Sequence, residues 1–172
     1  MLEVLSPAGS SDALVAAVQN GADAVYLGCG SFNARVNAKN FTLEQLHQWV
    51  SYCHIRGVKV YLTLNTLVLD RELKDVAREI LEASRAGVDA ILVQDLGVCQ
   101  LVRTLAPDVP IHASTQMAVY NLDGVLRAAE MGITRVVLAR ELSHDQIAYI
   151  CKHSPIEVEV FVHGALCMCY SG

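Results

Sequence analysis

Short apolar runs alternate with amphipathic stretches along the whole chain. The apolar runs are rich in β-branched residues and predict seven strands, at residues 2–5, 24–27, 58–64, 90–93, 111–113, 135–138 and 157–162. The stretches between them carry apolar residues at helical spacing and predict six helices, at 11–20, 42–56, 71–86, 96–105, 122–131 and 143–153. Runs that are apolar on both faces are typical of parallel strands covered by helices. The pattern therefore predicts a parallel α/β fold.

Start and stop signals support the predicted helix boundaries. Four helices are expected to end at a glycine that can adopt the left-handed conformation, namely Gly21, Gly57, Gly87 and Gly132. Two helices begin with a capping-box pattern, Thr42 with Gln45 and Ser143 with Gln146.

Strict strand–helix alternation favours a (β/α)8 barrel of the TIM type. Such a barrel usually needs about 250 residues, whereas this chain has 172. The sequence therefore predicts one incomplete barrel domain, residues 1–172, truncated after its seventh strand. A doubly wound sheet is the alternative, but no glycine-rich dinucleotide turn is present to support it. The two outer strands would leave exposed edges, so we expect a homo-oligomer, an exchange of elements between copies, or a chain that is one piece of a longer polypeptide.

Composition and charge narrow the class of protein. The mean hydropathy is +0.35, yet no apolar run reaches the ~18–20 residues that span a bilayer, so no membrane association is expected. Lys and Arg number 13 against 18 Asp and Glu, a net charge of −5, which argues against a general electrostatic clamp on nucleic acid. The six cysteines are mostly scattered among apolar neighbours and no secretory signal is visible, which favours the cytoplasm.

Polar and small residues follow every predicted strand. Because the carboxyl ends of parallel strands meet at one edge, these side chains are expected to line a shared pocket. The candidates for binding substrate are Arg35, Asn65, Gln94, Ser114 and Gln116, and the candidates for catalysis are Asp95, Arg140, Glu141 and His163.

The residue types suggest a role for each candidate and an alternative. Arg35 and Arg140 suit bidentate binding of a carboxylate or phosphate, although a structural ion pair with an acidic neighbour is equally consistent. The side-chain amides either orient a polar ligand or close hydrogen bonds at the rim. His163 is an acid, base or ligand candidate, or a structural histidine. Ser114 lacks the flanking glycines of a nucleophile elbow, which argues against a serine hydrolase.

Cys167 and Cys169 form the one closely spaced cysteine pair. Thiolates are the preferred ligands of soft metals and iron–sulfur clusters, but a cluster usually needs four of them. Cys29 also lies at the predicted rim, while Cys53, Cys99 and Cys151 are interpreted as small apolar residues of helices. Cys167 is thus either a cluster ligand, completed by residues beyond Gly172, or an ordinary thiol.

Several longer phrases resemble one known family. They are Leu-Ser-Pro-Ala-Gly at 5–9, Gly-Ala-Asp-Ala-Val-Tyr-Leu-Gly at 21–28, Leu-Asn-Thr at 64–66, Val-Gln-Asp-Leu-Gly at 93–97, His-Ala-Ser-Thr-Gln at 112–116, Val-Leu-Ala-Arg-Glu-Leu at 137–142 and Phe-Val-His-Gly-Ala-Leu-Cys at 161–167. In order and wording, these phrases resemble the peptidase U32 family over essentially the whole chain.

The resemblance implies two kinds of activity. The family takes its name from collagenase-like peptidases, but better understood members take part in oxygen-independent hydroxylation of transfer RNA, ribosomal RNA or a ubiquinone precursor. The phrases at 65–66, 94–95 and 114–116 look closest to the branch that makes 5-hydroxycytidine in 23S ribosomal RNA. This branch implies a 4Fe–4S cluster, with Cys167 as one ligand and the others beyond Gly172, and prephenate as the hydroxyl donor. Cys169 receives no ligand role.

Three functions follow as hypotheses. The first is hydroxylation of a structured RNA, in which the two carboxylates of prephenate meet Arg35 and Arg140. The second is a peptidase, for which His163 and Cys167 would have to form a thiol–imidazole pair; no zinc-binding helix or serine triad is present. The third is a ligand-binding barrel without catalysis.

Overall fold

The computed structural model describes residues 2–34 and 41–164. In this part of the chain, seven strands alternate strictly with six α-helices, and two short 3-10 turns interrupt the connections. The alternation confirms the predicted class, an α/β fold of the TIM-barrel type truncated after the seventh strand. The chain divides into two compact units, Met1–Val109 and Pro110–Gly172. The prediction of a single domain over 1–172 stays a prediction.

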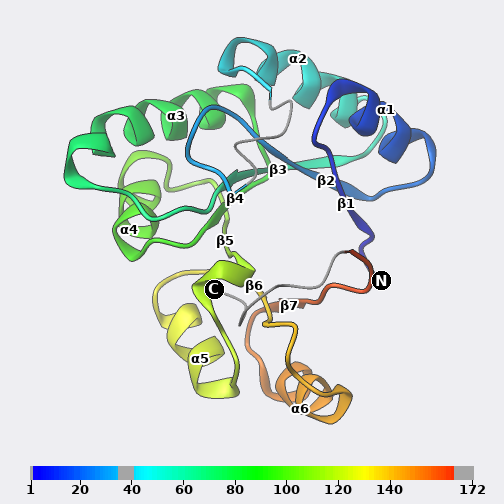
Figure 1. Cartoon of the computed structure of the whole chain (residues 1–172), viewed down its shortest axis with the longest axis vertical. Helices are drawn as coiled ribbons and strands as arrows, with labels where there is room; N and C mark the ends of the chain where they lie inside the picture. The colour runs from blue at the N-terminus through cyan, green and yellow to red at the C-terminus, as the bar shows by residue number, and fades with distance from the viewer. Residues whose placement is uncertain (1, 35–40, 165–172) are drawn as a thin grey trace. The chain divides into compact units, whose positions relative to one another are not determined.

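The first unit consists of four β/α repeats. In chain order they are β1 (Leu5–Pro7), α1 (Ser11–Gln19), β2 (Ala24–Gly28), α2 (Leu43–His54), β3 (Lys59–Leu64), α3 (Leu73–Ala86), β4 (Ala90–Val93) and α4 (Leu96–Leu105), with a 3-10 turn at Asp70–Glu72. The four strands pair in parallel and in sequence order, with Leu5 opposite Ala24, Ala24 opposite Lys59 and Leu64 opposite Val93. Figure 1 shows their helices on one side of these strands.

The second unit continues the same alternation. It contains β5 (Ile111–Ala113), a 3-10 turn at Thr115–Met117, α5 (Leu122–Glu130), β6 (Arg135–Val137), α6 (His144–His153) and β7 (Glu157–Glu159). β5 and β7 both pair in parallel with β6, so β6 is the central strand (Figure 1). α5 and α6 pack against each other.

The core of the first unit lies between strands and helices. β3 is buried at Val60, Tyr61, Leu62, Thr63 and Leu64, and β4 along its whole length. The apolar residues of α3 at 76, 80 and 83 are fully buried, at the spacing of one helical face. Burial of one large aliphatic side chain contributes roughly 1.5–3 kcal/mol to folding. This contribution favours burial of β3, whose apolar residues do not alternate with polar ones, in the centre of the sheet.

The predicted helix boundaries are confirmed at their caps. Both capping boxes are formed, by Thr42 with Gln45 and by Ser143 with Gln146. The four glycines that were expected to end helices, at 21, 57, 87 and 132, all have φ between +72° and +86°. A side chain at these positions would be strained, because the left-handed region penalises a Cβ.

Three predictions about local structure need correction. The first strand begins at Leu5 rather than at residue 2, because Leu2 is 94% exposed and the Val4 backbone is held instead by the Asp23 carboxylate. The last strand ends at Glu159, so residues 160–162 are exposed and follow the strand. Cys151 is exposed on α6 rather than packed among apolar neighbours.

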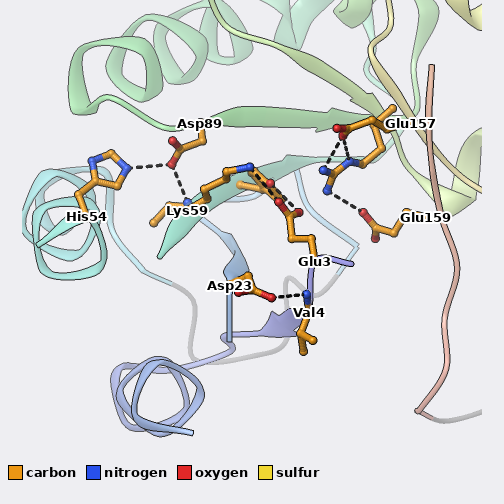
Figure 2. Close-up of polar contacts among 11 residues, drawn as sticks. Glu3, Val4, Asp23, His54, Lys59, Asp89, Glu157 and Glu159 are labelled. Atoms are coloured by element: carbon orange, nitrogen blue, oxygen red, sulfur yellow. Dashed lines mark hydrogen bonds and ion pairs between the residues drawn. The ribbon is translucent and has the colours of Figure 1, made fainter. Parts of the chain in front are cut away.

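Polar networks support the amino ends of the strands in each unit (Figure 2). In the first unit, Glu3 accepts hydrogen bonds from the Lys59 ammonium at 2.9 Å and from the Tyr61 hydroxyl at 2.8 Å. In the second unit, the Arg135 guanidinium is 9% exposed and lies 2.6 Å from a Glu157 oxygen and 3.5 Å from a Glu159 oxygen. Arg135 needs these carboxylates because an uncompensated buried charge is costly.

A membrane span is absent from the part of the chain that the structure describes: none of its helices has the length and apolar character that crossing a bilayer requires.

Candidate functional site

Two predicted substrate-binding residues of the first unit follow neighbouring strands. Leu64 and Val93 are paired across β3 and β4, so Asn65 and Gln94 leave the two strands at the same level. The Asn65 side-chain oxygen accepts a hydrogen bond from the Ala34 backbone at 3.1 Å. Asn65 therefore fixes the segment that follows β2 against the end of β3, whether or not it also contacts a ligand.

Asp95 holds backbone rather than a reacting group in this structure. One carboxylate oxygen accepts hydrogen bonds from the Gly97 and Val98 amides, at 2.7 and 3.1 Å, and so caps α4. The other accepts one from the Val68 amide at 3.3 Å and ties the β3–α3 connection to α4. These contacts are those of a positioning residue. The predicted catalytic role of Asp95 stays a prediction.

The exit of β2 is built around close packing of backbone and buried polar groups. The Asn33 amide group donates to the Cys29 and Gly30 carbonyls, at 3.4 and 3.2 Å. A Cβ at Gly28 would lie 2.6 Å from the Asn33 side chain, so only glycine fits there. Glu79 reaches this turn from α3, with one oxygen 3.0 Å from the position of a Gly30 Cβ.

Burial perturbs both ionisable groups at this turn. Desolvation raises the pKa of the Glu79 carboxyl to about 8, because the side chain is 3% exposed and its Oε1 has no hydrogen-bond partner. Desolvation, and then the neighbouring Glu79, raise the pKa of the Cys29 thiol to about 12. At neutral pH both groups are therefore protonated and neutral, so Cys29 is a poor thiolate donor.

In the second unit, two predicted substrate-binding residues contact each other. Ser114 is buried at the end of β5, and its hydroxyl donates to the Gln116 side-chain oxygen at 2.8 Å. The turn that carries Gln116 ends at Ala118, whose φ of 58° is left-handed. The residue after this turn, Val119, is held at the exit of β6, because its carbonyl accepts a hydrogen bond from the Ala139 amide at 3.1 Å.

Arg140 is oriented by an aromatic ring from the next strand connection. Its guanidinium carbon lies 3.9 Å from the centre of the Phe161 ring, a cation–π contact that favours the planar guanidinium over an ammonium. The edge of a guanidinium is the part that binds carboxylates bidentately. The predicted role of Arg140 in anion binding stays a prediction.

The remaining predicted residues are placed only in part. Glu141 and His163 are exposed after β6 and β7. Arg35, the second predicted anion contact, and Cys167, the predicted cluster ligand, lie outside the described residues. The expectation that all these side chains share one pocket stays a prediction.

The described cysteines do not fit an iron–sulfur cluster. Cys29, Cys53 and Cys99 are buried singly, and desolvation raises the pKa of all three thiols. Over residues 2–34 and 41–164, no group of three or more His, Cys, Asp or Glu side chains could hold a metal ion. Within this chain, the cluster hypothesis therefore depends on Cys167.

Sequence reasoning missed two contributors to these sites. Phe161 was interpreted as part of the last strand, although an aromatic residue two positions before His163 was visible. Glu79 was interpreted as part of an ordinary amphipathic helix; its place among the buried positions 76, 80 and 83 was the available signal.

The chain matches one family model over almost its whole length. Residues 9–172 match the model described as Peptidase family U32. The solved structure of the U32 peptidase Mk0906 superposes on 93% of this chain and 68% of its own, with a TM-score of 0.76 at 17% identity. This similarity concerns the fold.

Curated relatives carry two kinds of name. The 23S rRNA 5-hydroxycytidine C2501 synthase of Escherichia coli is 42% identical over 171 residues, which cover 99% of this chain and 26% of that protein. The tRNA hydroxylation protein P of Escherichia coli is 40% identical, over 99% of this chain and 38% of that protein. A collagenase of Porphyromonas gingivalis is 37% identical, over 99% and 43%. The chain spans less than half the length of each of these relatives.

Proposed function

We propose that this chain, which belongs to peptidase family U32, is part of an enzyme that hydroxylates a pyrimidine of a structured RNA to 5-hydroxycytidine or 5-hydroxyuridine. The observation that carries the proposal is the 42% identity, over 99% of the chain, to a ribosomal RNA 5-hydroxycytidine synthase. A second relative named for tRNA hydroxylation supports the same chemistry on RNA. The RNA is thus ribosomal or transfer RNA, and the compartment is the cytoplasm.

Arg140 is the side chain that we assign to an anionic co-substrate. A dicarboxylate such as prephenate is the hydroxyl donor in this proposal. The ring of Phe161 holds the guanidinium at 3.9 Å, so less rotational freedom is lost when a carboxylate binds its edge. Arg35 is assigned to the second carboxylate on the basis of its charge alone.

Neighbouring polar residues are assigned to orientation and proton transfer. Ser114 and Gln116 already share a hydrogen bond, and both are assigned to orientation of the substrate. His163, exposed beyond β7, is the acid/base candidate because an imidazole can both accept and donate a proton. Glu141 follows Arg140 directly and is the second acid/base candidate. In the first unit, Asn65 and Gln94 are assigned to substrate binding and Asp95 to support of their loops.

A 4Fe–4S cluster is the cofactor of the proposed enzyme. When bound, such a cluster supplies one-electron redox chemistry. Of the six cysteines of this chain, Cys167 is the one assigned as a ligand. The other cluster ligands are assigned to residues beyond Gly172. The test is to purify the complete polypeptide without oxygen and to measure its iron content, its sulfide content and its visible absorption. Cys167→Ser should lower all three. Cys151→Ser, which changes an exposed thiol of α6, should leave them unchanged.

The test of the activity is the nucleoside content of RNA. The complete polypeptide is expressed in cells that lack RNA hydroxylation, and digested ribosomal and transfer RNA are analysed by mass spectrometry. We expect a 5-hydroxypyrimidine nucleoside with the native protein, about a hundredfold less with Arg140→Ala because a charge-assisted bidentate contact is lost (about 3 kcal/mol), and an intermediate amount with Arg140→Lys. Arg127→Lys, an exposed ion-paired arginine of α5, is the matched control. RNA without hydroxylated nucleosides contradicts the proposal.

Proteolysis is the second candidate, favoured by the relative named collagenase. It requires His163 and Cys167 to act as base and nucleophile. Cleavage of gelatin that disappears in both His163→Ala and Cys167→Ala, but persists in Arg140→Ala, would support proteolysis and replace the first proposal.

A further inference from the structure

A groove between α5 and α6 has no part in the site described above. Its volume is about 330 Å³. Leu122 and Ile150 supply apolar lining, and Tyr120 and Tyr149 add aromatic rings. Ligand sites are concave and mainly apolar with a few polar groups, and this groove has that composition. None of its lining residues is one of the predicted substrate-binding residues at the strand ends.

Tyr149 provides an exposed aromatic platform at this groove. The residue is 57% exposed, yet its ring is not isolated: the His153 ring lies 4.4 Å from it, centre to centre, at a tilt of 42°. His153 is itself fixed, because its Nδ1–H donates to the Tyr149 carbonyl at 2.8 Å. Because the second ring already restricts the Tyr149 side chain, little side-chain entropy is lost when a ligand stacks on it.

Two amide side chains of the groove are oriented by the helix caps. The Asn121 oxygen accepts from the Gly124 backbone at 2.8 Å, and the Gln146 oxygen accepts from the Ser143 backbone at 2.8 Å. The oxygens are thereby engaged in the caps, and each NH2 group remains the donor of its side chain. Asp145, beside Gln146, adds an exposed carboxylate acceptor, one oxygen of which lies 3.7 Å from the Nδ1 of the equally exposed His144. The groove therefore combines two donors with one acceptor.

This set of groups complements one class of ligand. A cytosine has a flat face for stacking, an amino donor that carboxylates accept, and two acceptors on its pairing edge. Lys152 lies one helical turn beyond Tyr149 on α6, at the spacing of neighbouring surface positions, and supplies positive charge for a phosphate. A proline-rich peptide would use the aromatic rings but would leave the Asp145 acceptor without a donor, since proline lacks an amide hydrogen.

We propose that the α5–α6 groove binds one unstacked nucleobase of the RNA, with Tyr149 as the stacking platform and with a preference for cytosine over uracil. The inference rests on the proposed function for the identity of the substrate class, but its residues are separate from Arg140, Ser114 and His163. The groove holds a base that anchors the RNA and undergoes no reaction there.

The test is direct binding of labelled oligonucleotides by fluorescence anisotropy, with thermal unfolding as a check on folding. Hexamers of rC and rU are the probes, and a proline-rich hexapeptide is the competing ligand. Tyr149→Ala is expected to weaken rC binding by about tenfold or more, since one base stack is lost, while Tyr149→Phe keeps it. Asp145→Asn should abolish the preference for rC over rU. Cys151→Ser, exposed on α6 outside the groove lining, should bind as the native protein does.

The outcomes separate this inference from the proposed function. Unchanged rC affinity in Tyr149→Ala, or tighter binding of the peptide than of either hexamer, overturns the groove assignment and leaves the hydroxylation assay to stand or fall by itself. Binding of rC that depends on Tyr149, together with RNA that lacks hydroxylated nucleosides, supports the groove assignment and overturns the proposed function. Arg140→Ala should lose hydroxylation without losing rC affinity.

Discussion

The buried Glu79 carboxyl makes the stability of the first unit depend on pH. The residue lies on the apolar face of α3, where burial removes the water that an ionised carboxylate needs and outweighs the opposing effect of Arg78. It remains protonated at neutral pH for this reason. Its neutral form fits against the Gly30 backbone, at the turn that leads from β2 toward the predicted substrate contact Arg35.

The first prediction concerns the pH dependence of stability. The unfolded chain releases the Glu79 proton near the ordinary pKa of 4.5 and the folded chain near 8, so the folded state binds more protons between these values. Stability from this group is complete below pH 4.5, falls as the pH rises to about 8, and is constant above. Glu79→Gln should remove this fall, which is on the order of 5 kcal/mol at most. The measurement is the free energy of unfolding in urea from pH 5 to 9.

A matched substitution on the same helix provides the control. Glu82→Gln changes an exposed carboxylate that is paired with Arg85 and should keep the native pH profile. Equal profiles for the native protein and Glu79→Gln would contradict the assigned burial of the carboxyl.

Single residues were also where sequence reasoning reached its limit. Arg140 was singled out as an anion-binding candidate because a cation after an apolar strand is chemically conspicuous, and that role stays a prediction. Its ring partner Phe161 was not foreseen, since which side chains meet across two strand exits depends on how far each strand extends. Glu79 was missed because one acidic residue inside a helix with many charged residues does not change its helical pattern.

At the scale of elements, Asp95 joins two connections of the first unit. Its carboxylate caps α4 with one oxygen and holds the β3–α3 connection through Val68 with the other. The connection carries Asn65, and the residue before Asp95 is Gln94. The position of both amides therefore depends on a side chain that does not itself need to touch a substrate.

The second prediction distinguishes support from catalysis at Asp95. Asp95→Ala should lower the free energy of unfolding by about 1–2 kcal/mol, as expected for loss of a helix cap. Asp95→Asn retains one cap oxygen and should lose less stability and keep most hydroxylation activity. Urea unfolding and nucleoside analysis are the measurements. Full loss of activity in Asp95→Asn at native stability would instead establish Asp95 as a catalytic residue.

Elements with strong end signals were predicted well. The helix at 96–105 and the strands at 90–93 and 111–113 agree with the structure residue for residue. The first strand was placed three residues too early, because Leu2 and Val4 alternate with polar residues as strand residues do. Only tertiary pairing shows that Leu5 is the residue opposite Ala24.

For the molecule as a whole, the strand at the end of the second unit has an open side. In the described part of that unit, β7 pairs with β6 and with no other strand. Three apolar residues, 160–162, follow it at the surface, and Val162 is 93% exposed. Natural sheets usually protect such edges with charge or cover, so we propose that this edge associates with a second copy.

The third prediction tests that association. Val162→Lys should lower the molar mass measured by light scattering across a concentration series, because an edge lysine opposes pairing between copies. Leu126→Lys, at an exposed position of α5, is the control and should associate as the native chain does. A native chain that is monomeric at all concentrations would refute the proposal.

The overall class followed from the sequence and is confirmed, whereas the shared pocket stays a prediction. Alternation of strands and helices is encoded locally, in caps and in the period of apolar residues, so a single sequence suffices to read it. Whether Arg35, Arg140 and Cys167 converge depends on connections whose conformation has no such period. Within the second unit, for example, Ser114 contacts Gln116.

The close fit at the exit of β2 has a consequence for how this chain can diverge. Because a Cβ at Gly28 would lie 2.6 Å from the Asn33 side chain, a substitution at Gly28 requires that side chain to move or to become smaller. Relatives that carry alanine at position 28 should also carry a smaller residue at position 33. The residues at these two positions should therefore co-vary.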